Sequence, residues 1–175
     1  MEALKLLSGG GGGTPIPSPA PAPVPSNNST IVKKTPVPAP APGQLRVLFC
    51  GTYPIGQSNG YSRVVYYIAK YLGAKQDIAL TIYGFQNFQQ TFGSAQRNDI
   101  PSNVRLHDAL ATEEPKRNGF GENEIGTFLK ANPQDVVIIF NDMVITSALV
   151  QTIIKEIPQR TFKLVSYMDQ VYPYQ

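Results

Sequence analysis

The chain has 175 residues, which allows one domain of ordinary size and a tail. The formal net charge of +3 arises mostly in the first 43 residues, and the remaining near-neutral region has no basic run, which argues against nucleic acid binding. No apolar run approaches the roughly 20 residues of a membrane helix, and the single Cys50 cannot form an internal disulfide, so a reducing, cytoplasmic setting is expected.

Residues 1–43 are interpreted as a disordered tail rich in Gly, Pro and Ala. Five consecutive glycines occupy residues 9–13, and ten of the 16 prolines fall between Pro15 and Pro42. Such a segment has little apolar surface to bury, so we predict a flexible joint followed by extended polyproline II. The tail is either a spacer or a ligand for an SH3-like partner, and the spacer is the simpler interpretation.

The stretch from Leu45 to Leu72 predicts a strand, a glycine loop and a helix. It opens with a short run of branched and aromatic residues, which indicates a strand buried on both faces and ending at Gly51. Ser58 or Asn59 is expected to cap the helix, and Gly73 to supply a left-handed residue just past its end. Residues at the spacing of one helix face are Tyr61, Val64, Val65, Ile68, Ala69 and Leu72.

The loop before this helix is the predicted phosphate-binding element, because backbone N–H groups and the positive end of the helix dipole point into the space beyond the strand. An equally favoured alternative is that these glycines bind no phosphate and only permit tight turns. The spacing is not Gly-x-Gly-x-x-Gly and no Walker lysine is present, which argues against the standard dinucleotide and P-loop sites. The residues assigned to a phosphate are Gly56, Ser58, Asn59 and Gly60.

The remainder of the chain continues to alternate between strand and helix patterns. Residues 77–85 have the alternating character of a half-buried strand, and residues 86–101 and 111–123 read as loops. Right-handed crossovers then predict an α/β, Rossmann-like fold, with a mostly parallel sheet and helices on both faces. Further strands are expected at 103–106, 136–140 and 162–168, and helices at 124–131 and from about 144 to 156.

Ligands of such sheets bind at the carboxyl ends of the strands, which selects the glycine loop, Asn141-Asp142 and residues 169–174. Asn141 and Asp142 alternatively cap the helix that follows them. Asp169 has no evident capping role, so it is a candidate for a catalytic polar group. The only histidine, His107, is interpreted as structural, and without a His/Cys cluster no zinc site is predicted.

The opening stretch RVLFCGTYPIGQSNGYSRVVYYIAKYL resembles the start of the GT-B glycosyltransferases that use nucleotide sugars, especially the retaining family-4 type. In that family a first strand leads to a glycine-containing loop and a helix that begins near an arginine, where this chain has Asn59 to Arg63. Residues 135–142 are similar to the family's next buried strand, and residues 162–169 to the strand after it. The resemblance extends over about residues 45–175.

The resemblance implies transfer of a sugar from a nucleoside diphosphate to an acceptor hydroxyl, with retention of configuration and without a cofactor or metal. Residues 56–60 would approach the donor diphosphate, and Tyr53, Asn141, Asp142 and Asp169 would lie on the acceptor side. The family's second Rossmann-like domain, which completes the donor cleft, is not in this sequence. Residues 44–175 are therefore expected to be inactive unless a C-terminal domain or another chain completes the site.

Two departures from the family pattern bear on this interpretation. Asn59 replaces a glycine of the family's loop, and Met168 stands near the position where many members carry a histidine. The alternative interpretation is a non-catalytic Rossmann-like interaction domain, tethered by the proline-rich arm. A dehydrogenase-like nucleotide-binding domain is less favoured, because Gly84-Phe85-Gln86 ends the second strand without an acidic residue.

Overall fold

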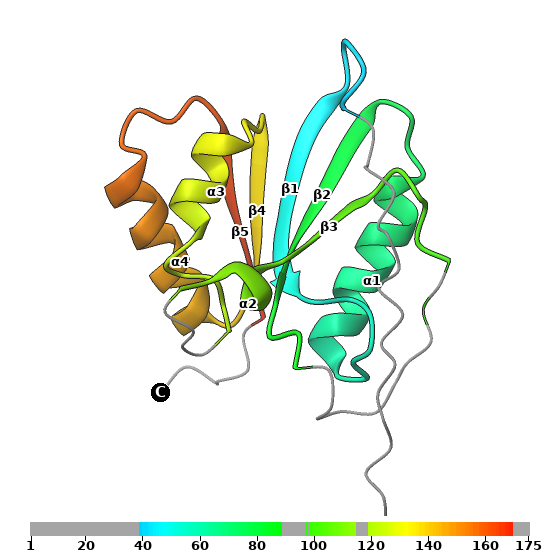
Figure 1. Ribbon diagram of the computed structural model, residues 1–175, viewed down its shortest axis with the longest axis horizontal. Coiled ribbons are helices and arrows are strands. Elements are labelled where there is room, and N and C mark those ends of the chain that lie inside the picture. The colour runs from blue at the N-terminus through cyan, green and yellow to red at the C-terminus, as the bar shows by residue number, and fades with distance from the viewer. Residues whose placement is uncertain (1–38, 89–96, 98, 115–118, 170–175) are drawn as a thin grey trace, which may run out of the picture. The chain divides into compact units, whose positions relative to one another are not determined.

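The computed structural model describes residues 39–88, 97, 99–114 and 119–169, so most of the predicted tail lies outside the described residues. Five parallel strands form one sheet in the order β3-β2-β1-β4-β5 (Figure 1). This confirms the predicted α/β, Rossmann-like fold. The elements are β1 (Leu45–Thr52), α1 (Gly60–Gly73), β2 (Ile78–Phe85), β3 (Arg105–Asp108), α2 (Ala109–Thr112), α3 (Ile125–Ala131), β4 (Val136–Asn141), α4 (Met143–Glu156) and β5 (Lys163–Met168).

Helices cover both faces of the sheet, as predicted. Figure 1 shows α1 on one side of the strands and α3 and α4 on the other. Alternate residues of β1 supply both cores, with Val47 and Phe49 packing toward α1 and Leu48 and Cys50 toward the opposite face. Within the described residues, no helix is long and apolar enough to cross a membrane.

β1 is the central strand and is longer than predicted. It pairs with β2 from Leu45↔Ile78 to Thr52↔Phe85 and with β4 on its other edge. The predicted end at Gly51 is wrong, because ladder pairing continues through this residue. A Cβ at Gly51 would lie 2.7 Å from Val65 Cγ2, so this glycine permits α1 to approach the strand closely.

Three further local predictions are wrong. β2 is buried on both faces from Leu80 onward, since it lies between two strands and under helices, and it does not alternate. β3 begins two residues later than predicted. The loop predicted from residue 111 overlaps the end of α2, a helix that starts because the Asp108 carboxylate accepts hydrogen bonds from the Leu110 and Ala111 N–H groups.

Gly73 is the last residue of α1 and is not the left-handed residue that the sequence predicted beyond the helix end. The φ angle of Gly73 is not positive, and the C-cap is Ala74, with φ −76°. A Cβ at Gly73 would lie 2.2 Å from Val104 Cγ2. Glycine is required here for close packing of α1 against the segment before β3, and not for a turn.

The amino end of the sheet is held by Arg46 and Asp135. The Asp135 carboxylate accepts hydrogen bonds from the Arg46 backbone N–H at 2.8 Å and from the Arg46 guanidinium at 2.6 and 3.0 Å. The Asp135 carbonyl accepts the Lys163 N–H at 3.0 Å. This group of bonds fixes β1 against β4 and β5, and the guanidinium holds the pKa of Asp135 down to about 2.

Replacing Gly73 by alanine is expected to lower the free energy of unfolding by about 1 to 3 kcal/mol, because the added methyl group overlaps Val104. The double variant Gly73→Ala/Val104→Ala should recover part of the loss relative to the sum of the two single changes, since removal of Val104 Cγ2 creates the missing space. Urea unfolding of the four proteins measures this coupling. Strict additivity would contradict the steric explanation.

Candidate functional site

The sheet has one topological switch point, between β1 and β4. From β1 the chain proceeds to β2 and β3 on one side, and β4 and β5 lie on the other side. The connections that follow β1 and β4 lead to helices on opposite faces. Because parallel sheets bind ligands at such a switch point, the carboxyl ends of these two strands are the candidate crevice. The Tyr61 and Phe140 rings lie 5.5 Å apart, so the start of α1 contacts the end of β4 here.

The loop between β1 and α1 is held by side chains inside the protein. Gln57 is buried, and its Nε2 donates to the Gln86 carbonyl oxygen at 2.7 Å. The buried Ser62 hydroxyl donates toward the Gln57 carbonyl at 3.0 Å. Sequence reasoning missed Gln57, because a polar residue in a glycine loop carries no local signal of burial. The loop is therefore a fixed part of the fold.

Two of the predicted phosphate-binding residues present open backbone. Gly56 has φ +76°. Among the described residues, and apart from the adjacent backbone, no atom lies within 4 Å of a Cβ built on Gly56 or on Gly60. Ser58, between them, is exposed. A ligand can therefore approach the backbone of this loop closely, as glycine permits.

Asn59 is the N-cap of α1, which confirms one of the two predicted caps. Its side-chain oxygen accepts the Ser62 N–H at 2.8 Å, and its amide group donates to Gln57 Oε1 at 3.1 Å. Both ends of the Asn59 amide are thus engaged within the protein. An anion at the start of α1 would be held by backbone N–H groups and not by this side chain.

The polar pair after β4 has the structural role that the sequence left open as an alternative. The Asp142 carboxylate accepts the Ile145 N–H at 2.9 Å and so caps α4. Asn141 is buried, and its side-chain oxygen accepts the Asp142 N–H at 2.9 Å. These two side chains fix the β4–α4 connection at the edge of the crevice.

The structure separates the other two predicted acceptor-side residues. Asp169 continues beside β4, its N–H donating to the Asn141 carbonyl at 3.2 Å, and its side chain is exposed. Tyr53 lies on the other side of β1, where its ring would be 2.3 Å from a Cβ on Gly84. Burial, and then the carboxylate of Asp108, raise the pKa of Tyr53. The predicted residues 170–174 lie outside the described residues.

Arg97 places a cation beside the start of α1. Its Nη1 donates to the Pro54 carbonyl at 2.8 Å and to Ser62 Oγ at 3.2 Å, and its guanidinium lies 5.1 Å from the centre of the Tyr66 ring. Burial lowers the pKa of Arg97, and the nearby charge of Arg63 acts in the same direction. Sequence reasoning missed Arg97 because it lies in an irregular segment far from the loop in sequence.

His107 belongs to a separate polar cluster at the end of β3. Its Nε2 lies 3.2 Å from Glu124 Oε1 and 3.2 Å from Thr112 Oγ1, and its ring packs against Tyr83 and Phe128. Burial lowers the pKa of His107, and the Glu124 carboxylate opposes this effect. These contacts agree with the structural role predicted for this histidine. In the described part of the chain, no group of three or more His, Cys, Asp or Glu side chains could hold a metal ion.

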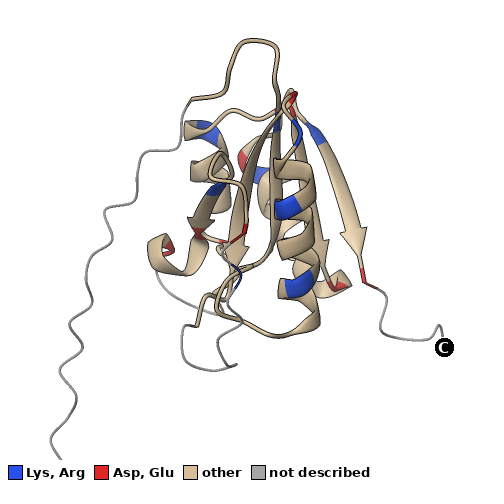
Figure 2. Ribbon diagram, turned by 90° about the vertical axis from the view of Figure 1, so that its right-hand side faces the viewer, with Lys and Arg blue, Asp and Glu red and all other residues tan. Residues whose placement is uncertain are grey.

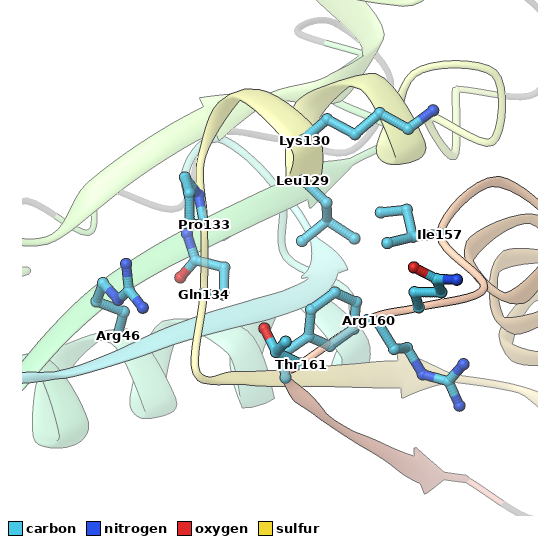
Figure 3. Close-up of a pocket in the computed structure, with 10 residues that line it drawn as sticks. Arg46, Leu129, Lys130, Pro133, Gln134, Ile157, Arg160 and Thr161 are labelled. Atoms are coloured by element: carbon cyan, nitrogen blue, oxygen red, sulfur yellow. The ribbon is translucent and has the colours of Figure 1, made fainter.

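A small cavity of about 170 Å³ lies at the opposite, amino end of the sheet. In Figure 3, Leu129 and Ile157 point into it, while the Arg160 guanidinium points away. Gln134 Oε1 is buried there, and no group in the described part of the chain forms a hydrogen bond with it. The cavity lies far from the carboxyl ends of the strands, where parallel sheets bind ligands, so it is not the candidate active site.

No family model matches the chain, and no curated protein is similar to it in sequence.

Replacing Asn59 by alanine is expected to lower the free energy of unfolding by about 1 kcal/mol, because the Ser62 N–H loses its acceptor. Asn59→Asp should retain most of this stability, since a carboxylate accepts the same bond and suits the helix dipole. Thermal and urea unfolding distinguish the two variants. Equal losses in both would show that the cap is not the source of the effect.

The His107 imidazole should titrate below the usual value of about 6.5. Because the folded state binds this proton less readily than the unfolded state, its contribution to stability is present above about pH 6.5 and declines as the pH falls below that value. Glu124→Gln should lower the pKa of His107 further, since the carboxylate raises it. The chain has a single histidine, so one imidazole NMR signal reports the titration. An unchanged midpoint in the variant would contradict the pairing.

Proposed function

We propose that this domain is the acceptor-side half of a retaining glycosyltransferase that moves a sugar from a nucleoside diphosphate to an acceptor hydroxyl. The proposal rests on the resemblance of its first strand, loop and helix to the GT-B enzymes. The loop between β1 and α1, fixed at the switch point with open backbone at Gly56 and Gly60, is the observation that carries it. Such a loop suits the diphosphate of a sugar donor.

The charges around the loop support binding of an anion. The start of α1 contributes the positive end of its helix dipole. Arg97 is bonded to the loop itself, and Arg63 lies in the first turns of α1. A departing diphosphate would thereby be stabilised as negative charge develops on it, without movement of the loop.

The remaining residues have defined positions in this proposal. Asn141 and Asp142 shape the β4 side of the crevice through their hydrogen bonds and need not contact the sugar. Asp169 presents the exposed carboxylate that the acceptor side requires. Because Gly56 and Gly60 leave the loop open, transfer is expected to need a second domain or another chain to cover the donor.

A second candidate function is a non-catalytic interaction domain. One observation favours it: the side chains of Asn59 and Asp142 at the switch point are both occupied as helix caps. The fold then uses its polar residues for stability, and the site would depend on backbone groups and arginines alone. This candidate predicts no binding of nucleotide sugars.

Binding of nucleotide sugars to the full chain distinguishes the two functions. We expect UDP-glucose and GDP-mannose to shift the backbone amide NMR signals of residues 56–61. Gly60→Leu should weaken this binding at least tenfold, because the side chain would fill the space that a phosphate needs, yet nothing within 4 Å opposes its folding. The matched control is Ala74→Leu at the exposed far end of α1, which should bind like the unchanged chain.

NAD and inorganic pyrophosphate are tested in the same way as the two nucleotide sugars. Shifts caused by NAD but not by either sugar donor would favour the dehydrogenase-like interpretation. No shift with any of these ligands at millimolar concentration would overturn the proposal and leave the interaction domain. Pyrophosphate alone should reproduce part of the shifts, because the loop contacts the phosphates.

A further inference from the structure

β5 is an outer strand, and among the described residues no strand pairs with its free edge. The Lys163 N–H donates to Asp135, and the Asp169 N–H donates to Asn141. In a parallel pair, every second residue directs both backbone groups to the neighbouring strand. The backbone groups of Leu164, Ser166 and Met168 therefore point to the free edge.

This edge lacks the features that usually protect outer strands. Between Lys163 and Asp169 there is no charged residue and no proline. Val165, Tyr167 and Met168 are 44%, 51% and 50% exposed, which is high for apolar side chains in a sheet. An exposed, apolar edge of this kind is suited to pairing with another strand.

The sequence of β5 is complementary to itself in the antiparallel direction. With Ser166 opposite Ser166 of a second copy, Leu164 lies opposite Met168 and Val165 opposite Tyr167. Leu164, Ser166 and Met168, whose backbone groups point to the free edge, then form the hydrogen-bonded pairs that an antiparallel ladder requires. Val165 and Tyr167 fall in a non-hydrogen-bonded pair, where side chains approach most closely and β-branched and aromatic residues interact favourably.

The charges match in the same register. Lys163 of one copy lies opposite Asp169 of the other, and the two-fold axis creates this pair twice. Figure 2 shows the outer strand with a basic residue at its start and an acidic residue at its end. Within the described residues, neither side chain forms an ion pair in the single chain. Opposite charges across antiparallel strands stabilise the pairing.

The helix above β5 offers a second apolar surface at the same edge. Glu156 contacts Lys130 and Gly126 of α3, so this flank of α4 faces α3. Helical spacing places Met143, Val150 and Ile154 on the opposite flank. Met143 is 66% exposed and Ile154 is 46% exposed. Met143 and Val150 are seven residues apart, and Val150 and Ile154 are four apart, which is the spacing of residues along the contact between two packed helices.

Pairing of two β5 strands and packing of two α4 helices require compatible distances between the two copies. Paired strands lie about 4.8 Å apart, and α4 packs over β4 and β5, with Leu149 and Ile153 in the same core as Leu164. Two copies joined through β5 would therefore bring their α4 axes to roughly 10 Å, within the usual range for packed helices. The strand edge and the helix flank can thus be covered together.

We propose that a second copy of this chain covers the β5 edge, and that two sheets join through antiparallel β5 strands into one continuous sheet with α4 packed against α4. Ser166 lies on the two-fold axis, and Lys163 pairs with Asp169 across it. This dimer is independent of the proposed function, because its evidence lies in β5 and α4 and not in the glycine loop.

Charge reversal in the full chain tests the register. Sedimentation equilibrium over a wide concentration range should show a monomer–dimer equilibrium. Lys163→Asp and Asp169→Lys should each weaken dimerisation roughly tenfold, because each places like charges opposite one another twice. The double variant Lys163→Asp/Asp169→Lys should restore dimerisation, since the pairs are then reversed. Ile154→Asp should also weaken the dimer, through the α4 seam.

Crosslinking tests the position of the axis. Ser166→Cys should give a disulfide-linked dimer under mild oxidation, because hydrogen-bonded pairs have Cα atoms about 5.5 Å apart. Thr127→Cys, exposed on α3, is the matched control and should stay monomeric on a non-reducing gel. Native Cys50 is fully buried and should not react. A chain that stays monomeric at every concentration would overturn the proposal. So would a dimer whose strength is unchanged by the charge reversals and that forms no disulfide with Ser166→Cys.

Discussion

The structure depends on the double pairing of β1. Both edges of this strand are hydrogen-bonded, to β2 and to β4, and both faces are covered by apolar cores. Because β1 lies between strands that the chain reaches in opposite directions, the order of the sheet changes there and opens the crevice at its carboxyl end. At its amino end, Arg46 and Asp135 hold β1, β4 and β5 in register. The position of the candidate site therefore follows from the pairing of one strand.

The crevice is built by polar residues that bond to the protein itself. Gln57 and Ser62 fix the loop, while Asn59 and Asp142 cap the two helices that begin at the crevice. What remains available to a ligand is backbone, exposed by glycines, together with the charge of Arg97. This division of roles suits an anionic ligand, because N–H groups and a helix dipole bind phosphate without a specific side chain.

The two outer strands of the sheet, β3 and β5, differ in the contacts that surround them. At the β3 end, the His107 cluster and α2 close the strand with internal hydrogen bonds and ring contacts. At the β5 end, apolar side chains face outward, together with backbone groups that pair with no strand of the described residues. Association of this edge with another strand would therefore gain both backbone hydrogen bonds and apolar burial.

The sequence by itself determined the elements whose signals are local. The apolar runs of β1 and β4, the spacing of α1 and α4, and the caps Asn59 and Asp142 were all predictable, because each depends on residues within a few positions. The tertiary structure alone decided the packing role of Gly73, the position of β3, the burial of Gln57 and the approach of Arg97 to the glycine loop. These features join residues roughly 30 or more positions apart or depend on burial by other elements, so no short window of sequence contains their cause.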